Sequence, residues 1–119
     1  MGLFNDFLYA ENVPEEQSQG ERMTQRAMIA EFEVKPSEFE KFVTAANHEL
    51  RQVRENEPGC LRFDVLLFDE KEGTGAFLAT FADQSEYDGH RDYTHAIEFF
   101  DAIKNIDVIW KVRRGNALS

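Results

Sequence analysis

The stretch Glu57-Pro58-Gly59-Cys60-Leu61-Arg62-Phe63-Asp64-Val65-Leu66 decides the fold of this chain. A helical pattern runs into it from Pro36, and Pro58 and Gly59 are residues that stop helices. A run of alternating character follows at once, which is typical of a strand. The sequence therefore predicts a sharp passage from a helix to a strand at this point.

The helix before this junction is indicated by apolar residues that recur every three or four positions. Pro36 suits a first helical turn, with Ser37 and Glu38 beside it. The resulting stripe predicts one amphipathic helix of about five turns. Its members are Phe39, Phe42, Val43, Ala46, Leu50 and Val53.

Four strands are predicted by alternation of side chains and by the polar segments between them. In residues 28–34, Met28, Ala30, Phe32 and Val34 share one face. The predicted strands are residues 28–34, 60–68, 76–82 and 107–113. The second strand should carry Leu61, Phe63, Val65 and Leu67 on one face, and the fourth should carry Val108, Trp110 and Val112. Residues 69–75 are polar and contain glycine, as hairpin connections do.

A second helical region is expected after the third strand, where Asp83, Gln84 and Ser85 are candidate N-caps. It should break near residues 92–94. Its second part, residues 96–104, places Ile97, Phe100 and Ile103 on one stripe.

The predicted order is β-α-β-β-α-β, an α+β fold of the ferredoxin-like type with a four-stranded antiparallel sheet. Helices would cover one face of the sheet. The other face carries mixed apolar side chains and needs a partner surface, for which a second copy of the chain is the simplest choice. We therefore expect a homodimer whose sheets pack together, closing into a dimeric α+β barrel.

Composition limits the partners. The chain has 119 residues, enough for one domain, and a formal charge of −10 that disfavours nucleic acid and anionic membrane surfaces. No apolar run reaches the roughly 20 residues that span a bilayer. The single cysteine, Cys60, excludes an intrachain disulfide, and the N-terminus lacks a basic signal-peptide start. We expect a cytoplasmic protein with no membrane partner.

Residues 1–24 differ in character from residues 25–119, which form the predicted domain. Leu3, Phe4, Phe7 and Leu8 have helical spacing, and a polar segment follows them. This N-terminal extension is interpreted either as an arm that docks on a core or partner, or as a disordered tail.

Two segments resemble the antibiotic biosynthesis monooxygenase (ABM) domain family. Residues 57–65 are similar to its helix-to-strand signature, and residues 81–90 are similar to a strand end, polar turn and histidine in the family. His95, followed by Phe99 and Phe100, resembles a second family histidine and its phenylalanine, with looser spacing. The resemblance covers residues 26–113.

The resemblance implies a dimeric α+β barrel. Members of the family oxidise polyphenols or quinols with molecular oxygen and without metal or flavin, others degrade haem, and others process small signalling molecules. This chain departs from the haem-degrading pattern, since Glu31 or Phe32, His90 and Phe100 stand near the positions of its Asn, Trp and ligand His. The resemblance therefore implies no cofactor.

The candidate catalytic residues are His90 and His95. A neutral histidine can accept a phenolic proton near pH 7, because its reference pKa is about 6.5. They are five residues apart and would share a cavity only if the helix breaks between them. The alternative places His90 on the surface between two acids and His95 at a helix start.

Four further residues are candidates for binding a flat aromatic substrate: Tyr93, Trp110, Asn47 and Phe100. Trp110 also suits simple core packing, and Asn47 also suits an exposed helix position.

Other sites are disfavoured. Asp88, His90, Asp92 and His95 could be read as metal ligands, and Asp88 and Asp92 have the i, i+4 spacing that metal sites use on a helix. Both are more simply explained as solvated acids on a helix face, so we expect no metal. Residues 73–75 lie in a hairpin rather than before a helix, which does not fit a phosphate-binding loop. Cys60 has no obvious base beside it and is interpreted as a small buried thiol.

These features predict a cofactor-independent monooxygenase acting on a small phenolic or quinol-type substrate. The alternatives are a non-catalytic dimeric module that binds a small ligand, and an isomerase or degradative enzyme for a small signalling molecule. The enzyme interpretation requires an apolar cavity with a histidine on its wall. The module interpretation requires a filled core and histidines in solvent.

Overall fold

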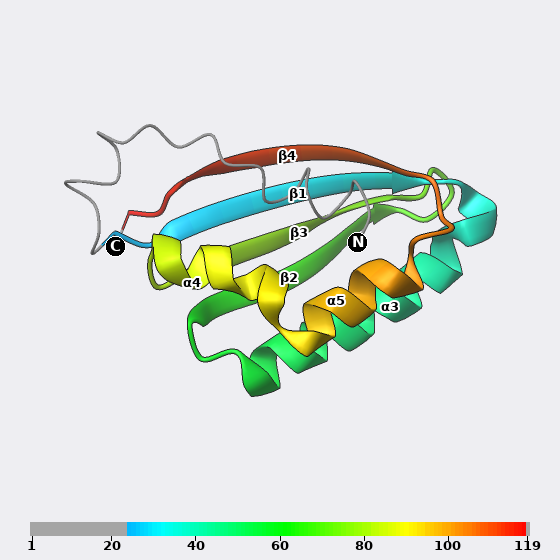
Figure 1. Cartoon of the computed structure of the whole chain (residues 1–119). Coiled ribbons are helices and arrows are strands. Elements are labelled where there is room, and N and C mark those ends of the chain that lie inside the picture. Colours follow the sequence, from blue (N-terminus) through cyan, green and yellow to red (C-terminus); the bar gives the residue numbers. More distant parts are fainter. Residues whose placement is uncertain (1–23, 119) are drawn as a thin grey trace.

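The structure is a computed structural model that describes residues 24–118. The N-terminal extension proposed for residues 1–24 therefore lies almost entirely outside the described residues. The elements, in order, are β1 (Arg26–Val34), α3 (Pro36–Asn56), β2 (Cys60–Asp69), β3 (Thr74–Phe81), α4 (Gln84–Gly89), η1 (His90–Asp92), α5 (Thr94–Ala102) and β4 (Val108–Asn116). The predicted α+β, ferredoxin-like fold is confirmed (Figure 1).

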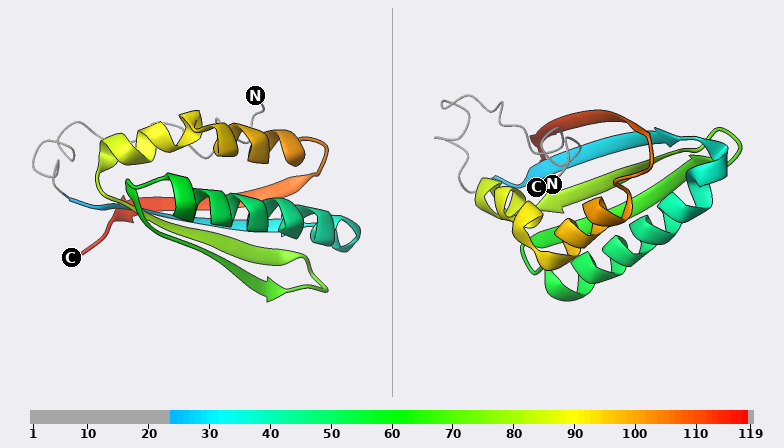
Figure 2. Two further views of the ribbon diagram at one scale, coloured as in Figure 1. Left: turned by 90° about the horizontal axis from the view of Figure 1, so that it is seen from below. Right: turned by 45° about the vertical axis from the view of Figure 1, so that its right-hand side comes forward.

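The four strands form one antiparallel sheet in the order β2-β3-β1-β4. Helices α3 and α5 lie side by side over one face of this sheet, and α4 continues the helical layer toward one end (Figures 1 and 2). The core fills the space between the two layers. It is rich in phenylalanine, with Phe42 and Phe81 fully buried.

Helix α3 follows the predicted stripe. It begins with Pro36 in its first turn and buries Phe39, Phe42, Ala46 and Val53. It ends where Glu57 donates its backbone N–H to the Val53 carbonyl, just before Pro58. The Cys60 N–H then bonds to the Glu57 carbonyl, so the chain turns directly into β2. The junction that decides the fold is therefore as tight as the sequence indicated.

Strand β1 alternates as predicted, with Met28, Ala30, Phe32 and Val34 buried. Strand β2 alternates less regularly, because its pairing with β3 shifts register between Cys60 and Arg62 and again between Leu67 and Asp69. Leu61 and Leu67 are exposed, whereas Phe63 on the predicted face is buried. A register irregularity changes which side chains face the core.

One predicted stripe was wrong in part. Ile97 is 47% exposed, although it was placed with Phe100 and Ile103 on the buried face of the second helix. The buried residues of α5 are His95, Ala96, Phe99 and Phe100. The helix starts at Thr94 after an extended Tyr93, and this start sets a rotation that buries His95 instead of Ile97.

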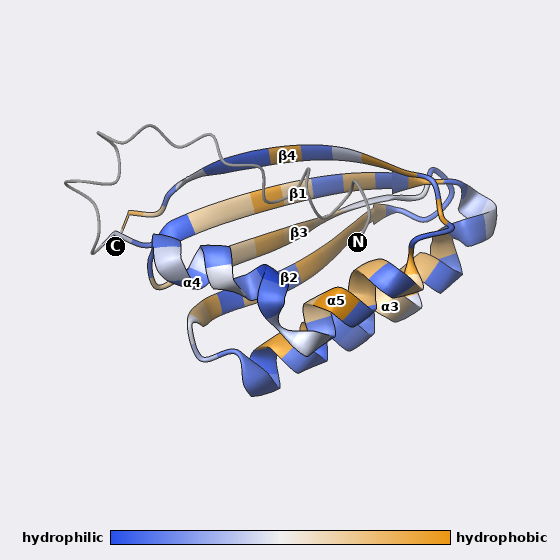
Figure 3. Cartoon of the chain, viewed as in Figure 1, coloured by the Kyte–Doolittle hydropathy of each residue, from blue (hydrophilic) through white to orange (hydrophobic). Residues whose placement is uncertain are grey.

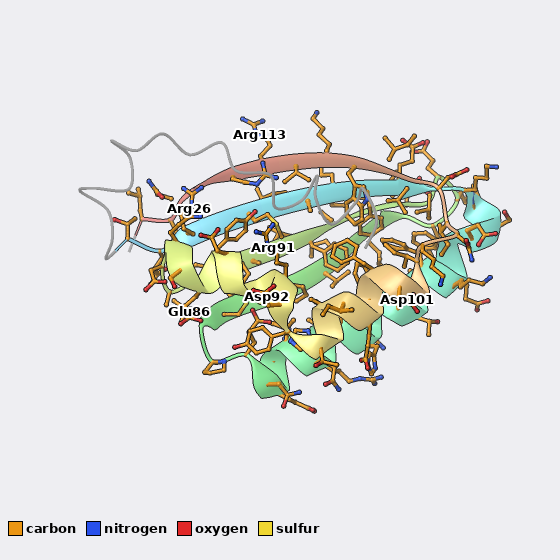
Figure 4. The ribbon with its side chains drawn as sticks, viewed as in Figure 1. Arg26, Glu86, Arg91, Asp92, Asp101 and Arg113 are labelled. Atoms are coloured by element: carbon orange, nitrogen blue, oxygen red, sulfur yellow. The ribbon has the colours of Figure 1, made fainter. Side chains whose placement is uncertain are left out.

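The second face of the sheet is covered by no other described element (Figure 2). Hydrophobic and hydrophilic residues both occur along β1 and β4, as the colour bands show (Figure 3). Ile29 and Ile109 are exposed, and Glu31 stands opposite Lys111 on the neighbouring strand. Arg113 points away from the helical layer in Figure 4. Within residues 24–118, no helix is both long and apolar enough to cross a membrane.

Candidate functional site

The predicted break in the second helical region is present and positions both candidate histidines. Helix α4 is capped by Asp83, whose carboxylate accepts the Glu86 N–H at 2.9 Å. The chain then tightens into η1 at His90, becomes extended at Tyr93, and starts α5 at Thr94. Because of this break, His90 and His95 face the same interior, with ring centroids 5.9 Å apart. The segment lies over one end of the covered sheet face and carries the labelled Glu86 and Asp92 in Figure 4.

Two glutamates complete the site. We call the four side chains the His–Glu cluster; its members are Glu49, Glu57, His90 and His95, which are only 2%, 3%, 3% and 4% exposed. Glu49 comes from the middle of α3, and Glu57 is the residue at the end of that helix. The histidines come from η1 and α5. The cluster therefore joins three elements of the helical layer.

The two histidines and two glutamates alternate around a ring. His90 Nδ1 lies 2.7 Å from Glu57 Oε2, and His90 Nε2 lies 3.5 Å from Glu49 Oε2. His95 Nδ1 lies 3.0 Å from Glu49 Oε1, and His95 Nε2 lies 3.2 Å from Glu57 Oε1. Every imidazole nitrogen thus faces a carboxylate. The two Nδ1 contacts are aligned hydrogen bonds, whereas His95 Nε2 makes no aligned hydrogen bond within the described part of the chain.

Burial rules out the alternative surface position for His90. His95 does lie in the first turn of α5, but the cap position is Tyr93 and the His95 side chain is buried. Burial also raises the pKa of Glu49, because it penalises the carboxylate more than the neighbouring histidines stabilise it. Perturbed carboxyl groups with specific partners are characteristic of functional sites.

A small pocket lies against one side of the cluster. Its volume is about 20 Å³, and a pocket needs roughly 10–15 Å³ to hold one water molecule. Glu49 and His90 provide its polar wall. The rest of the lining is apolar and comes from all four strands and α5: Met28, Ala30, Phe63, Phe77, Phe99, Phe100 and Trp110. The pocket is thus an apolar space with an acid–base pair at one end.

The predicted substrate-binding residues differ in where they lie relative to the pocket. Phe100 and Trp110 line the pocket, and Trp110 also packs against the aromatic core, 6.1 Å from Phe42 between ring centroids. Tyr93 does not line the pocket but stacks on His95, with centroids 5.1 Å apart. Burial, with the charges of Glu57 and Glu86, raises the pKa of Tyr93. Asn47 is exposed on α3 and outside the pocket lining, so we drop it from the site.

Cys60 and its neighbours belong to a different region. Burial and the charge of Glu57 raise the pKa of the Cys60 thiol to about 12, which does not suit a nucleophile. Arg62 and Asp64 pair within the chain at 2.6 Å. The guanidinium groups of Arg62 and Arg54 hold the pKa of Asp64 below its usual value.

No group of three or more histidine, cysteine or acidic residues between positions 24 and 118 is arranged to hold a metal ion. In the His–Glu cluster, the nitrogens and oxygens face one another in pairs.

The two glutamates were missed in the sequence. Glu49 falls between Ala46 and Val53 on the apolar stripe of α3, where a charged side chain is unusual. A charged residue at this position could have indicated a buried site. It was overlooked because Leu50, beside it, already continued the apolar stripe. Glu57 was visible only as the residue before Pro58, and its role depends on a contact with His90, 33 residues away.

The sequence matches the model of the antibiotic biosynthesis monooxygenase family over residues 26–102. This match covers the elements that build the sheet face, the pocket and the His–Glu cluster, except β4. The chain belongs to the antibiotic biosynthesis monooxygenase family. The resemblance inferred from residues 57–65 and 81–90 is thereby confirmed. No curated protein gives a significant match to the sequence.

Solved structures share the fold of this family member. A Caulobacter crescentus protein provisionally described as an antibiotic biosynthesis monooxygenase has a TM-score of 0.77 and 17% identity, covering 88% of this chain and 100% of its own. A Nitrosomonas europaea protein with the same provisional description has a TM-score of 0.73 and 19% identity, covering 82% and 94%. A conserved Methanosarcina mazei protein has a TM-score of 0.67 and 21% identity, covering 79% and 93%. At these identities the likeness shows the fold alone.

Proposed function

We propose that this family member is a cofactor-independent monooxygenase that acts on a small phenolic or quinol-type substrate. The observation that carries the proposal is the acid–base pair Glu49 and His90 on the wall of an otherwise apolar pocket. Apolar walls suit an aromatic ring, and the polar end suits its hydroxyl group. Family membership supplies the reaction class.

The chemistry requires a proton to leave the substrate. A deprotonated phenol or quinol is electron-rich and can pass an electron to oxygen. For a quinol, the balanced reaction converts one quinol and one O₂ into a hydroxyquinone and one water. Both electrons for the second oxygen atom come from the substrate. We assign removal of the ring O–H proton to the pocket side of the cluster, where His90 and Glu49 lie. His95 Nδ1, which is not part of the pocket lining, contacts Glu49 Oε1 at 3.0 Å and positions this carboxyl group.

Pocket size bears on how a substrate binds. An engineered cavity of about 150 Å³ holds benzene, whereas this pocket measures about 20 Å³. Aromatic side chains on its wall, such as Phe100 and Trp110, must therefore move before a ring can enter. This makes substrate entry a conformational step, for which loop and side-chain rearrangements are common.

We also propose that the active form is a homodimer. The open sheet face presents exposed Ile29 and Ile109, together with Leu66 and Phe68 from β2. An apolar area of this kind on a sheet face favours a partner. In a symmetric dimer the same patch meets its own copy, and rows such as Glu31 opposite Lys111 offer both charges to the partner.

Oxygen uptake with a panel of hydroquinones tests the function. We expect the wild type to consume oxygen and His90→Ala to lose roughly 10²–10⁴-fold, the usual contribution of a general base. Glu49→Gln, which keeps the shape of the side chain, should also lose activity. His48→Ala is the matched control, because His48 is exposed on α3. No uptake by the wild type above background would reject the function for that panel.

Two other functions use parts of the same site. An isomerase would also need a buried acid–base pair, and the pair Glu49 and His90 favours it over a passive binding module, whose histidines should lie in solvent. Exchange of substrate hydrogen with deuterated water, without oxygen uptake, would identify an isomerase. Equal uptake by the wild type and by His90→Ala would retain the oxygenase and reject our assignment of the base.

A further inference from the structure

The His–Glu cluster is a closed ring of four nitrogen–oxygen contacts between 2.7 and 3.5 Å. Each contact attracts only if one proton lies between its nitrogen and its oxygen. Without that proton, a lone pair on nitrogen faces a lone pair on oxygen and the contact repels. The two aligned Nδ1 contacts account for two protons, and the two longer Nε2 contacts attract only when two further protons are present, which gives four.

The net charge of the cluster leads to the same number of protons. Two neutral imidazoles and two carboxylates hold two N–H protons between them and carry a net charge of −2. All four residues are at least 96% buried, and an uncompensated charge in such a place is costly. Two further protons make the cluster neutral and bring its total to four. The contact distances and the electrostatics thus favour the same proton count.

Several groups around the ring add negative charge or stay neutral. The Coulombic partners that act on Glu49 are His90, His95 and Glu57, all members of the cluster. Cys60 on β2 and Tyr93 before α5 both sense Glu57, and burial raises the pKa of each, so both stay neutral. Glu86 on α4, which also acts on Tyr93, adds negative charge to this side. These surroundings favour extra protons in the cluster.

We propose that the His–Glu cluster is a proton store, which in the resting protein holds four protons in total on its imidazole nitrogens and carboxylate oxygens. This deepens the proposed function, on which its catalytic use rests. To accept a substrate proton, the resting cluster first releases one of its four protons to solvent, which leaves a three-proton form with a charge of −1. This form becomes neutral when it takes the substrate proton. The proton later returns to the oxygen atom that leaves as water. Glu57 is then a positioning residue that acts through His90.

Nuclear magnetic resonance can count these protons directly. With ¹⁵N-labelled histidine and ¹³C-labelled glutamate, the imidazole nitrogens and the carboxyl carbons report whether each site is protonated. The chain has three histidines, so exposed His48 gives an internal reference for an imidazole in water. Near neutral pH we expect four protons in the cluster. A total of three or fewer would overturn the proposal.

Replacing the cluster glutamates with glutamine should lower the number of protons in the cluster in whole steps. Glu57→Gln removes one negative charge, so a neutral cluster then needs only three protons, and adding Glu49→Gln reduces the number to two. Glu55→Gln, at an exposed position two residues before Glu57, should leave the count at four. A count that does not fall with Glu57→Gln would contradict the proposal. If an amide variant does not fold, the wild-type count decides alone.

The count separates the two hypotheses, since it is made without substrate or oxygen. A protein that holds four protons but consumes no oxygen would keep the proton store and lose the oxygenase. A protein that consumes oxygen but holds only two protons in its cluster would keep the oxygenase and lose the store.

Discussion

His90 Nδ1 lies 2.7 Å from Glu57 Oε2, although 33 residues separate the two in the chain. The contact links the end of α3 to the η1 turn. Both side chains are buried, so neither has water as a substitute partner. The pair therefore stabilises the packing of α3 against η1 and is also part of the candidate site.

Removing one partner of this pair should destabilise the protein. We expect Glu57→Ala to lower the free energy of unfolding by about 3–5 kcal/mol, because His90 is left buried beside an empty position. Glu55→Ala, exposed on the same helix, should change it by less than about 0.5 kcal/mol. Urea denaturation of both variants measures the difference. Equal stability of the two variants would contradict the ion-pair geometry.

The hairpin between β2 and β3 requires glycine at position 73. Gly73 has a φ of 73°, and a Cβ there would clash with the Val34 carbonyl oxygen. We expect Gly73→Ala to cost roughly 1–3 kcal/mol in thermal or urea unfolding. Gly89→Ala is the control, because Gly89 has a φ of −74° and no atom within 4 Å of an added Cβ. It should be neutral, or stabilising by about 0.4–1 kcal/mol.

Cys60 should react slowly with thiol reagents. Its pKa is raised from 9.0 to about 12, so at a pH below 9 the folded protein has about 10³-fold less thiolate than an ordinary cysteine. Since thiolate is the reacting form, alkylation by iodoacetamide should slow by about that factor relative to the urea-unfolded chain. A folded rate within tenfold of the unfolded rate would show that the thiol is neither buried nor near a negative charge.

The proposed dimer predicts that the two layers respond differently to a charged substitution. Ile109 on the open sheet face is 67% exposed, and Ile97 on the helical layer is 47% exposed. We expect Ile109→Asp to shift the protein toward monomer in sedimentation velocity, since it places a charge in the proposed apolar contact. Ile97→Asp should leave the assembly unchanged. A wild type that sediments as a monomer at micromolar concentration would reject the dimer.

Much of the fold followed from local patterns. The alternation in β1 and the stripe from Phe39 to Val53 each describe one element, and the structure confirms both. The side of α5 that faces inward could not be predicted from the local sequence pattern. Tyr93 breaks the region and sets the start of α5, so Phe99 rather than Ile97 faces the core.

Half of the His–Glu cluster was predicted from the sequence. His90 and His95 were candidates because histidine is a common base, and the break that brings them together was expected. Glu49 and Glu57 were missed, since acids are rarely buried and nothing in the sequence shows that histidines from η1 and α5 lie above them. A charged residue on an apolar helical stripe, as at Glu49, indicates a buried polar partner elsewhere in the chain.

The end of α3 has a consequence for engineering the molecule. The residue that terminates the helix also supplies a carboxylate to the cluster, and only Pro58 and Gly59 separate it from β2. An insertion at this junction would displace the carboxylate along with the strand, so length changes there should be lethal to folding and chemistry together. The hairpin tip between Asp69 and Thr74, at the other end of β2, is remote from the cluster. Fusion tags or grafted loops belong in that turn, outside its single constrained glycine.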